Sequence, residues 1–402
     1  MFGGKTTLAL VCVFLTSCTQ NTDEDGAQSA RDTHSSAIVI DAHSDFLDRT
    51  AIDGAHINED PEGAQTSLSK LEQGGVDAQF FSVFVPPAFA EYGFAKRTDE
   101  LIDTLQAEVA AHPDRIEIVH DTAGINRLAN TGKVAALIGI EGGHSIENDL
   151  GRLRHFYGRG VRYMTLTWTN TNDWADSSGD EPRWNGLNDL GLSIVKEMNG
   201  LGMMIDISHV SDETFWDVIR ATGSPVIASH SDVRGVMDDP RNMSDDMVKA
   251  VAENGGVIQV SFYSAYVDSD FAEAFAAAKA RAKDRFDALE NKYANDPIAL
   301  DKAAWSLEKS IEFSLPAPTV ADVVDHIDHV VKIAGIDHVG LGSDFDGMGA
   351  PPSGLEHAGQ IPNITAELVR RGYGRADIEK ILGGNLLRVF AENEKRAARR
   401  AP

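Results

Sequence analysis

The chain has 402 residues, of which 42% are hydrophobic and 24% are charged, and this length allows one large domain or two of medium size. These fractions are typical of a globular protein and exclude a disordered or fibrous chain. The formal net charge of −26 argues against a nucleic-acid partner, because phosphates require a basic surface. Composition therefore indicates a globular protein with an acidic surface and leaves the substrate open.

The N-terminus has the pattern of a targeting segment. An apolar run, TLALVCVFL (7–15), follows a lysine and is too short to cross a bilayer as a stable helix. The adjoining LTSC (15–18) resembles the bacterial lipoprotein signal, in which the cysteine is lipidated and becomes the first residue of the mature protein. We therefore predict a signal peptide over 1–17 and a lipid anchor on Cys18. The alternative is an ordinary secretory signal with a chance cysteine.

The lipoprotein resemblance also implies a location. Signals for inner-membrane retention usually carry Asp after the cysteine, whereas this chain has Thr19. We expect a lipid-anchored protein of the bacterial cell envelope, on the outer membrane and facing the periplasm. Residues 18–36 are polar and lack an apolar period, which predicts a flexible tether. With Cys12 removed and Cys18 acylated, the mature chain cannot form an intramolecular disulfide.

Short apolar segments alternate with helical patterns over 37–395, which we expect to be one domain. Such strands, separated by helices, are typical of a parallel sheet covered on both faces. Eight units predict an α/β fold, the (β/α)8 TIM-type barrel, with its site at the C-terminal strand ends. A doubly wound open sheet is the alternative, but no glycine-rich phosphate fingerprint follows the first strand. The expected strands are 37–41, 79–85, 134–140, 161–168, 203–208, 225–229, 256–263 and 338–344.

One segment departs from this alternation. Residues 268–314 are rich in alanine and charge and predict a helical insertion between the seventh and eighth strands. Such an insertion most often packs on the outside of a barrel. Because it leaves the C-terminal end of a strand, it could instead form a partial lid over the site or a contact in a homodimer.

Four of the expected strands end in residues that bind metals. The first leads into His43 and Asp45, whose imidazole and carboxylate lie on the same side of an extended segment. Glu141 follows the third strand, His209 the fifth and His230 the sixth. These ligands suit a hard-to-borderline divalent metal, and their convergence at the barrel mouth predicts a metal centre.

The number of ligands favours two ions over one. Five are too many for a single structural zinc but suit two ions that share a bridge, and Glu141 could be that bridge. Two such ions would hold a bridging water and lower its pKa, which supplies hydroxide for attack on an amide carbonyl. Asp344, at the end of the eighth strand, is the candidate proton shuttle, whereas Asp346 would point to the opposite side and cap a turn. Arg241 could hold a substrate carboxylate through a bidentate pair.

Several segments, in chain order, resemble the membrane (renal-type) dipeptidases, zinc metallopeptidases of the amidohydrolase-like superfamily. The resemblance covers about residues 37–393 and therefore the whole expected domain. It implies a dipeptide substrate and two zinc ions, or another divalent metal in their place. The matching segments are DAHSD (41–45), IGIEGGHSI (138–146), RYMTLTWTN (162–170), MIDISHVS (204–211), SHSDVR (229–234), PRNMSDD (240–246), GSDFDG (342–347) and GGNLLRVF (383–390).

The resemblance also assigns the metal ligands. It implies that His43 and Asp45 hold one ion and that His209 and His230 hold the other. Glu141 is implied to bridge the two ions.

Four residues are implied to contact the substrate. Arg241 would bind the C-terminal carboxylate of the dipeptide, and Asp344 would contact its amino end and transfer protons. Tyr263 matches a tyrosine of the substrate pocket, with packing at the barrel rim as the alternative. Many family members carry His at the position of Trp168, where it helps to hold the tetrahedral intermediate.

The tryptophan puts the usual substrate range in question. An indole cannot accept a proton, although its N–H can donate one hydrogen bond. Asn170, Asn172 or His144 could take over the role of the missing histidine.

These observations favour a binuclear zinc dipeptidase of the bacterial envelope, with L,D-dipeptides as candidate substrates. Another amidohydrolase reaction, on N-acyl amino acids or lactams, is the enzymatic alternative. Arg241 separates the two, because a free carboxylate close to the scissile amide suits a dipeptide. A lipid-anchored solute-binding protein is the non-enzymatic alternative, and it would not need the metal ligands.

Overall fold

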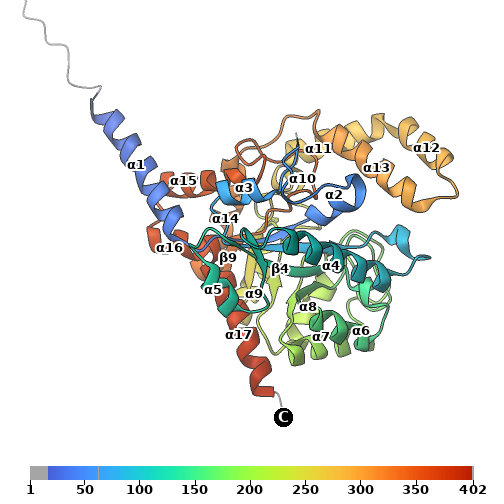
Figure 1. Ribbon diagram of the computed structural model, residues 1–402. Coiled ribbons are helices and arrows are strands. Elements are labelled where there is room, and N and C mark those ends of the chain that lie inside the picture. The colour runs from blue at the N-terminus through green and yellow to red at the C-terminus, as the bar shows by residue number, and fades with distance from the viewer. Residues whose placement is uncertain (1–16, 62, 401–402) are drawn as a thin grey trace, which may run out of the picture.

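A parallel β-barrel forms the centre of the protein (Figure 1). The computed structural model describes residues 17–61 and 63–400. The sheet has the order β1-β2-β4-β5-β6-β7-β8-β9, and each neighbouring pair is parallel. The strands are β1 (Ile40–Ser44), β2 (Ala78–Phe84), β4 (Val134–Glu141), β5 (Val161–Thr165), β6 (Met204–Asp206), β7 (Ile227–Ala228), β8 (Val257–Val260) and β9 (Val339–Leu341).

The barrel closes between β9 and β1. Asp45 N donates a hydrogen bond to Phe345 O at 2.8 Å, and Asp344 N donates to His43 O at 3.2 Å. Ser44 and Phe345 form a parallel bridge beside them. The predicted (β/α)8 barrel is therefore confirmed, and each of the eight predicted strands overlaps an observed one.

A further strand escaped prediction. β3 (Ile116–Ile118) pairs with the first part of β4, whereas β5 pairs with its last part. Three residues with a central glutamate are too few to show a strand period.

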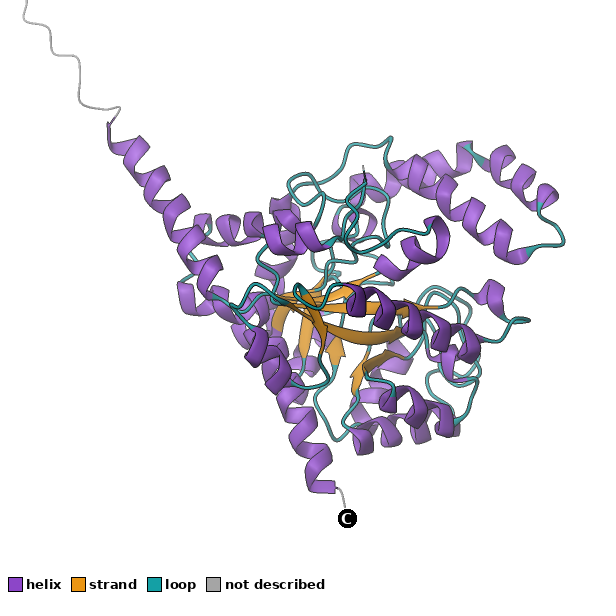
Figure 2. Ribbon diagram, in the orientation of Figure 1, coloured by secondary structure: helices purple, strands orange, loops and turns teal. Residues whose placement is uncertain are grey.

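Helices cover the outer face of the sheet (Figure 2). Ser211 and Ser244 cap two of them by accepting hydrogen bonds from backbone N–H groups three residues later. The α-helices around the barrel are α2 (Phe46–Asp53), α3 (Leu68–Gln73), α4 (Phe94–Ala111), α5 (Thr122–Leu128), α6 (Leu150–Gly158), α7 (Asp189–Leu201), α8 (Asp212–Ala221), α9 (Asp245–Asn254), α10 (Ser264–Val267), α14 (Val320–Ala334), α15 (Pro362–Arg370), α16 (Arg375–Glu379) and α17 (Asn385–Arg400). Short helical turns are η1 (Pro87–Phe89), η2 (Gly143–Ile146), η3 (Ile336–His338), η4 (Ala358–Gln360) and η5 (Lys380–Gly384).

Successive side chains along each strand point to opposite faces of the sheet, and this alternation divides the hydrophobic core into two parts. In β4, Leu137 belongs to a cluster inside the barrel, while Ile138 and Ile140 belong to the layer between sheet and helices. The inner cluster includes Leu386 and Phe390 of α17, which pack against the beginnings of the strands. Helix α17 thus covers the N-terminal end of the barrel and leaves the C-terminal end for a site.

The structure gives residues 18–36, the predicted tether, as part of a helix. Ser17–Ser36 forms helix α1, whose C-terminal part lies beside α15, while its first turns project away from the barrel (Figure 1). His34 is buried, with its Nδ1 2.7 Å from Thr365 Oγ1 and its Nε2 2.8 Å from Gly74 O. The sequence of this segment has no regular spacing of apolar residues, so it predicts no packed helix. Hydrogen bonds from His34 to residues far away in the chain connect the segment to the barrel domain.

The folded unit therefore extends beyond the predicted limits of 37 and 395, since α17 also continues to Arg400. The predicted signal peptide, apart from Ser17, lies outside the described residues, and so does the side chain of Cys18. Within the described part of the chain, no helix combines the length and the apolar character that a bilayer span requires.

The predicted helical insertion lies between β8 and β9. It comprises α11 (Ser269–Arg281), α12 (Lys283–Lys292) and α13 (Pro297–Glu312). These three helices, orange in Figure 1, project beside α2. It has a small core of its own, which includes Phe271, Phe275 and Leu307. Helix α13 also contacts η1, the turn that follows β2. The insertion thus reaches across the C-terminal end of the barrel.

Candidate metal centre

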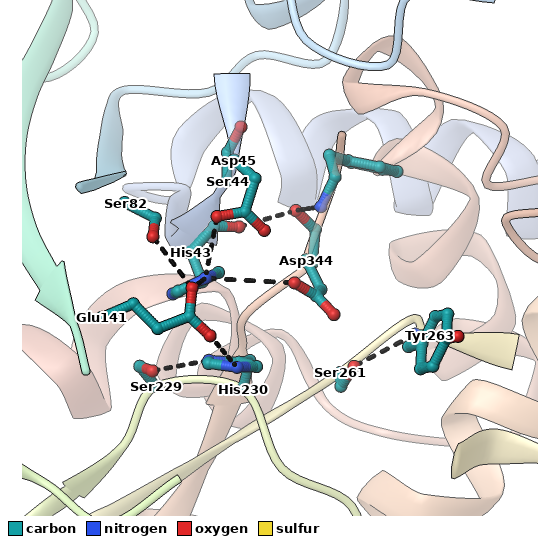
Figure 3. A network of polar contacts seen from close by, with 12 residues as sticks. His43, Ser44, Asp45, Ser82, Glu141, Ser229, His230, Ser261, Tyr263 and Asp344 are labelled. Carbon is teal, nitrogen blue, oxygen red and sulfur yellow. Dashed lines mark hydrogen bonds and ion pairs between the residues drawn. The ribbon is translucent and has the colours of Figure 1, made fainter. Parts of the chain in front are cut away.

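The five predicted ligands lie together at the C-terminal end of the barrel. Figure 3 shows four of them, His43, Asp45, Glu141 and His230. Glu141 Oε2 lies 3.3 Å from His43 Nε2. Glu141 Oε1 lies 3.0 Å from His209 Nε2 and 3.5 Å from His230 Nε2. Each oxygen of this carboxylate therefore faces a different set of imidazole nitrogens, as a bridging ligand would.

Two further carboxylates lie on the His43 side. His43 Nε2 is 3.5 Å from Asp45 Oδ1 and 3.9 Å from Asp344 Oδ1. Two sets of ligand atoms each fall within 4.8 Å of one another: His43, Glu141 and His230, and His43, Asp45 and Asp344. Asp344 thus lies beside the centre, as predicted for a residue that exchanges protons there.

Unpartnered atoms show that the residues fit a metal. His43 Nε2 and Asp45 Oδ1 are buried and make no hydrogen bond to the described part of the chain. His209 Nε2 and His230 Nε2 face each other at 2.9 Å, an arrangement that a shared cation stabilises. Imidazole nitrogens and carboxylate oxygens are ligands that divalent zinc accepts.

Burial and charge set the protonation of these ligands. Burial and the charge of Arg241 lower the pKa of His209 to about 4, and burial also holds the pKa of His230 well below its usual value. Both rings are therefore neutral near pH 7, the form that binds metals. Burial alone would raise the pKa of Glu141, but the charge of His43 and the close contacts with His209 and His230 hold it well below its usual range. The bridge is thus a carboxylate.

Tyr163, a residue that sequence analysis missed, orients His43. Its hydroxyl donates to Ala42 O at 3.2 Å and lies 2.8 Å from His43 Nδ1. His43 therefore donates its Nδ1–H to the tyrosine oxygen, which leaves Nε2 free to bind a metal. The tyrosine ring occupies the space where a side chain at Gly139 would be, because a Cβ there would lie 2.0 Å from its Cζ.

A hydroxyl and a carboxylate support His230 in the same way. Ser229 Oγ lies 2.7 Å from His230 Nδ1 and donates to Asp206 Oδ2 at 2.6 Å. Ser82 Oγ donates to Glu141 Oε2 at 3.1 Å. Such contacts fix the ligand geometry before a metal arrives. In the sequence, these residues are indistinguishable from ordinary polar residues of strand ends.

The loops at the centre carry backbone strain. His209 has a φ of 66° and Asp344 has a φ of 65°. Residues other than glycine rarely adopt this left-handed backbone region. Strain of this kind is retained where the surrounding structure enforces it, often at functional sites.

A cavity of about 830 Å³ opens above the centre. Asp45, Glu141, His209 and Asp344 contribute to its wall, and so do residues of α11 and α13. The insertion therefore acts as a partial lid, and the expectation that it packs on the outside is wrong. Helix α13 contacts η1 on the other side of the mouth, so the insertion spans part of the opening.

The predicted substrate residues differ in their exposure to this cavity. Tyr263 lines it, and its hydroxyl donates to Glu312 Oε1 at 2.7 Å. Arg241 is buried beneath, where it donates to His230 O at 2.6 Å and to Ser231 Oγ at 2.7 Å. Its guanidinium lies 5.5 Å from the ring centre of Tyr266, which does line the cavity. Arg241 is therefore separated from the cavity by residues such as Tyr266 and is not part of its wall.

Trp168 also lines the cavity, with its ring centre 4.5 Å from that of Phe84. Two of the residues that could replace the missing histidine serve the fold. His144 Nε2 lies 2.8 Å from Val85 O, and Asn172 donates to Leu166 O at 2.8 Å. These two side chains are therefore engaged away from the substrate.

Asp346 points away from the centre, as predicted, but it joins loops and does not simply cap a turn. Its carboxylate accepts hydrogen bonds from Gln65 N at 3.2 Å and Thr66 N at 3.0 Å. Arg49 Nη1 donates to it at 3.2 Å. It therefore fixes the segment that follows β9 to the loop that precedes α3.

The fold and the site together define a (β/α)8-barrel protein with a candidate metal centre of histidines and carboxylates at its C-terminal mouth. Residues 27–401 match the family model of the membrane dipeptidases (Peptidase family M19), and the chain belongs to this family.

Curated relatives include Dipeptidase 3 of Rattus norvegicus, 33% identical over 368 residues, which cover 89% of this chain and 65% of the relative. The chain thus spans just under two thirds of that relative's length. Dipeptidase verJ of Clonostachys rogersoniana is 33% identical over 343 residues, 83% of this chain and 76% of the relative. Among solved structures, the probable dipeptidase PvdM from Pseudomonas aeruginosa superimposes with a TM-score of 0.79 at 30% identity, over 93% of this chain and 100% of that one.

Proposed function

We propose that the protein is a binuclear metallo-dipeptidase that uses zinc. The observation that carries this proposal is the placement of Glu141, whose two oxygens face separate sets of imidazole nitrogens. Its family membership supports a peptidase reaction. When bound, two divalent ions supply Lewis acidity and a water that is nucleophilic at neutral pH.

The residues of the chain supply the proton transfer. Burial, reinforced by the charge of Asp45, raises the pKa of Asp344 well above its usual value. We propose that Asp344, whose Oδ1 lies 3.9 Å from His43 Nε2, exchanges a proton with the amine that leaves. In its deprotonated state, the same carboxylate attracts the free amino group of the substrate.

Recognition of the opposite end of the dipeptide falls to Arg241. The cavity floor above it carries Tyr266, and the guanidinium is the buried cation beside this part of the wall. A substrate carboxylate that reaches it would form a charge-assisted pair in a site shielded from water. Dipeptides with a D-residue at the second position, such as those of peptidoglycan, are the substrates that we propose to test first.

The deciding experiment measures metal content and hydrolysis on the same preparation. We expect about two zinc ions per chain, and hydrolysis of free dipeptides that stops on chelation and returns with zinc. The panel should contain L,L- and L,D-dipeptides, their C-terminal amides and N-acyl amino acids. Turnover of N-acyl amino acids without turnover of dipeptides would replace this proposal with the alternative amidohydrolase reaction.

We propose in addition that Cys18 anchors the protein in the outer membrane. The lipoprotein-like segment LTSC (15–18) supports this location. Expressed in a Gram-negative host, the protein should take up labelled palmitate and fractionate with outer membranes. Cys18→Ser should lose the label and appear in the periplasmic fraction. Labelling of the Cys18→Ser variant would refute the anchor.

A further inference from the structure

The cavity is larger than its proposed small substrate requires. Its volume of about 830 Å³ is in the range of sites that enclose drug-sized ligands. A dipeptide of two small residues is much smaller than such a ligand, and its backbone must stay close to Glu141 and Asp344. Space therefore remains on the side of the insertion.

Aromatic rings from both sides of the mouth surround this space. Trp305 of α13 and Phe275 of α11 contribute from the insertion, and Phe89 contributes from η1. Helix α13 contacts η1, so the wall continues from one side to the other. Phe275 also belongs to the core of the insertion, whereas Trp305 is absent from that cluster. Trp305 is therefore a residue of the cavity wall that the core of the insertion does not enclose.

Lys279, Arg97 and Glu308 of this wall have ion-pair partners, whereas Asp48 and Asp301, which also line it, have none in the described part of the chain. Lys279 Nζ lies 2.6 Å from Glu308 Oε1, and Arg97 Nη1 lies 3.1 Å from Glu100 Oε2. Lys309 Nζ lies 4.6 Å from the ring centre of Trp305 and donates to Asp346 O. The cavity wall as a whole exposes more apolar than polar surface, so burying an apolar group against it is favourable.

We propose that Phe89, Phe275 and Trp305 form a distal apolar subsite that selects dipeptides with one bulky apolar side chain, aromatic residues above all. The inference rests on the proposed dipeptidase activity and specifies its substrate class. Three aromatic residues in one cavity wall favour an aromatic partner, because aromatic pairs gain energy beyond the area that they bury. The role of the insertion is then specificity, since its residues lie away from the metal ligands.

The test compares Trp305→Ala with the unaltered protein on zinc-loaded full-length samples. The substrates are Ala-Ala and dipeptides with Phe or Trp at the first or the second position. We expect kcat/KM for the preferred aromatic dipeptide to fall by about 10- to 100-fold, and for Ala-Ala by less than about twofold. Trp305→Phe should retain most of the preference, because it keeps an aromatic ring.

Phe313→Ala is the matched control. Phe313 follows α13 in the same insertion, is 64% exposed and is outside the cavity wall, so this variant should keep the full preference. An equal loss for aromatic and small dipeptides in Trp305→Ala, or no loss, would overturn the subsite. A protein that hydrolyses no dipeptide at all would instead refute the proposed function, so the two failures are distinguishable.

Discussion

Replacing Tyr163 by Phe removes one oxygen atom from the support of the metal centre and keeps the ring that fills the barrel. The lost oxygen is the acceptor 2.8 Å from His43 Nδ1 and the donor to Ala42 O. Burial raises the pKa of Tyr163 above its usual range, so the hydroxyl keeps its proton and holds His43 in the tautomer that binds metal through Nε2. We expect zinc affinity to fall by about 10- to 100-fold, equivalent to about 1.4–2.7 kcal/mol.

Competition with a chelator of known affinity measures this change on the metal-free protein. Thermal unfolding without zinc reports the separate cost of leaving the His43 Nδ1–H unpaired, about 1–3 kcal/mol. Tyr157→Phe is the control, because Tyr157 lies on α6 with its ring 4.4 Å from the guanidinium carbon of Arg162. A Tyr163→Phe affinity within about twofold of the unaltered protein would refute the orienting role.

Four further changes test the site and the fold. Glu141→Gln removes one ligand oxygen and a negative charge, so we expect loss of at least one zinc ion and of activity; full occupancy with normal turnover would contradict the binuclear centre. Arg241→Ala should lower kcat/KM for free dipeptides by about two orders of magnitude, and amidated dipeptides should be poor substrates of the unaltered protein; equal hydrolysis of free and amidated forms would remove this role. Trp168→His should be active and shift the substrate profile toward bulkier residues, because the smaller ring frees volume beside Phe84; an unchanged profile would show that Trp168 does not touch the substrate. Burial lowers the pKa of His326 to about 4. As the pH falls below about 6.5, His326 is protonated in the unfolded chain before it is protonated in the folded protein. Denaturant unfolding should therefore show that this residue removes about 3 kcal/mol of stability between pH 7 and pH 4. The difference between the unaltered protein and His326→Gln isolates that contribution, and parallel pH profiles would contradict it.

Local sequence was sufficient to predict the barrel and to identify residues that the structure brings together in the candidate metal centre. An apolar run followed by His, Asp or Glu marks a strand and its C-terminal end, and parallel strands in a closed barrel place these ends together. For this reason His43, Glu141 and His230 were identifiable although they lie far apart in the chain. β3 was missed because three residues carry no period.

The supporting contacts depended on the tertiary structure. Tyr163 meets His43, and Asp346 meets Gln65, only because the barrel closes and the loops above it pack together. The position of helix α1 also depends on the tertiary structure, because His34 contacts Gly74 and Thr365, which lie in distant parts of the chain.

The insertion shows most clearly what sequence and tertiary structure each determined. Its alanine-rich pattern predicted helices between two strands of the barrel, because helical periodicity is a local property. Its position over the site depends on the contact between α13 and η1, which are encoded by segments about two hundred residues apart. Packing between such distant surfaces leaves no periodic signal in the sequence, so only the folded chain places Trp305 on the cavity wall.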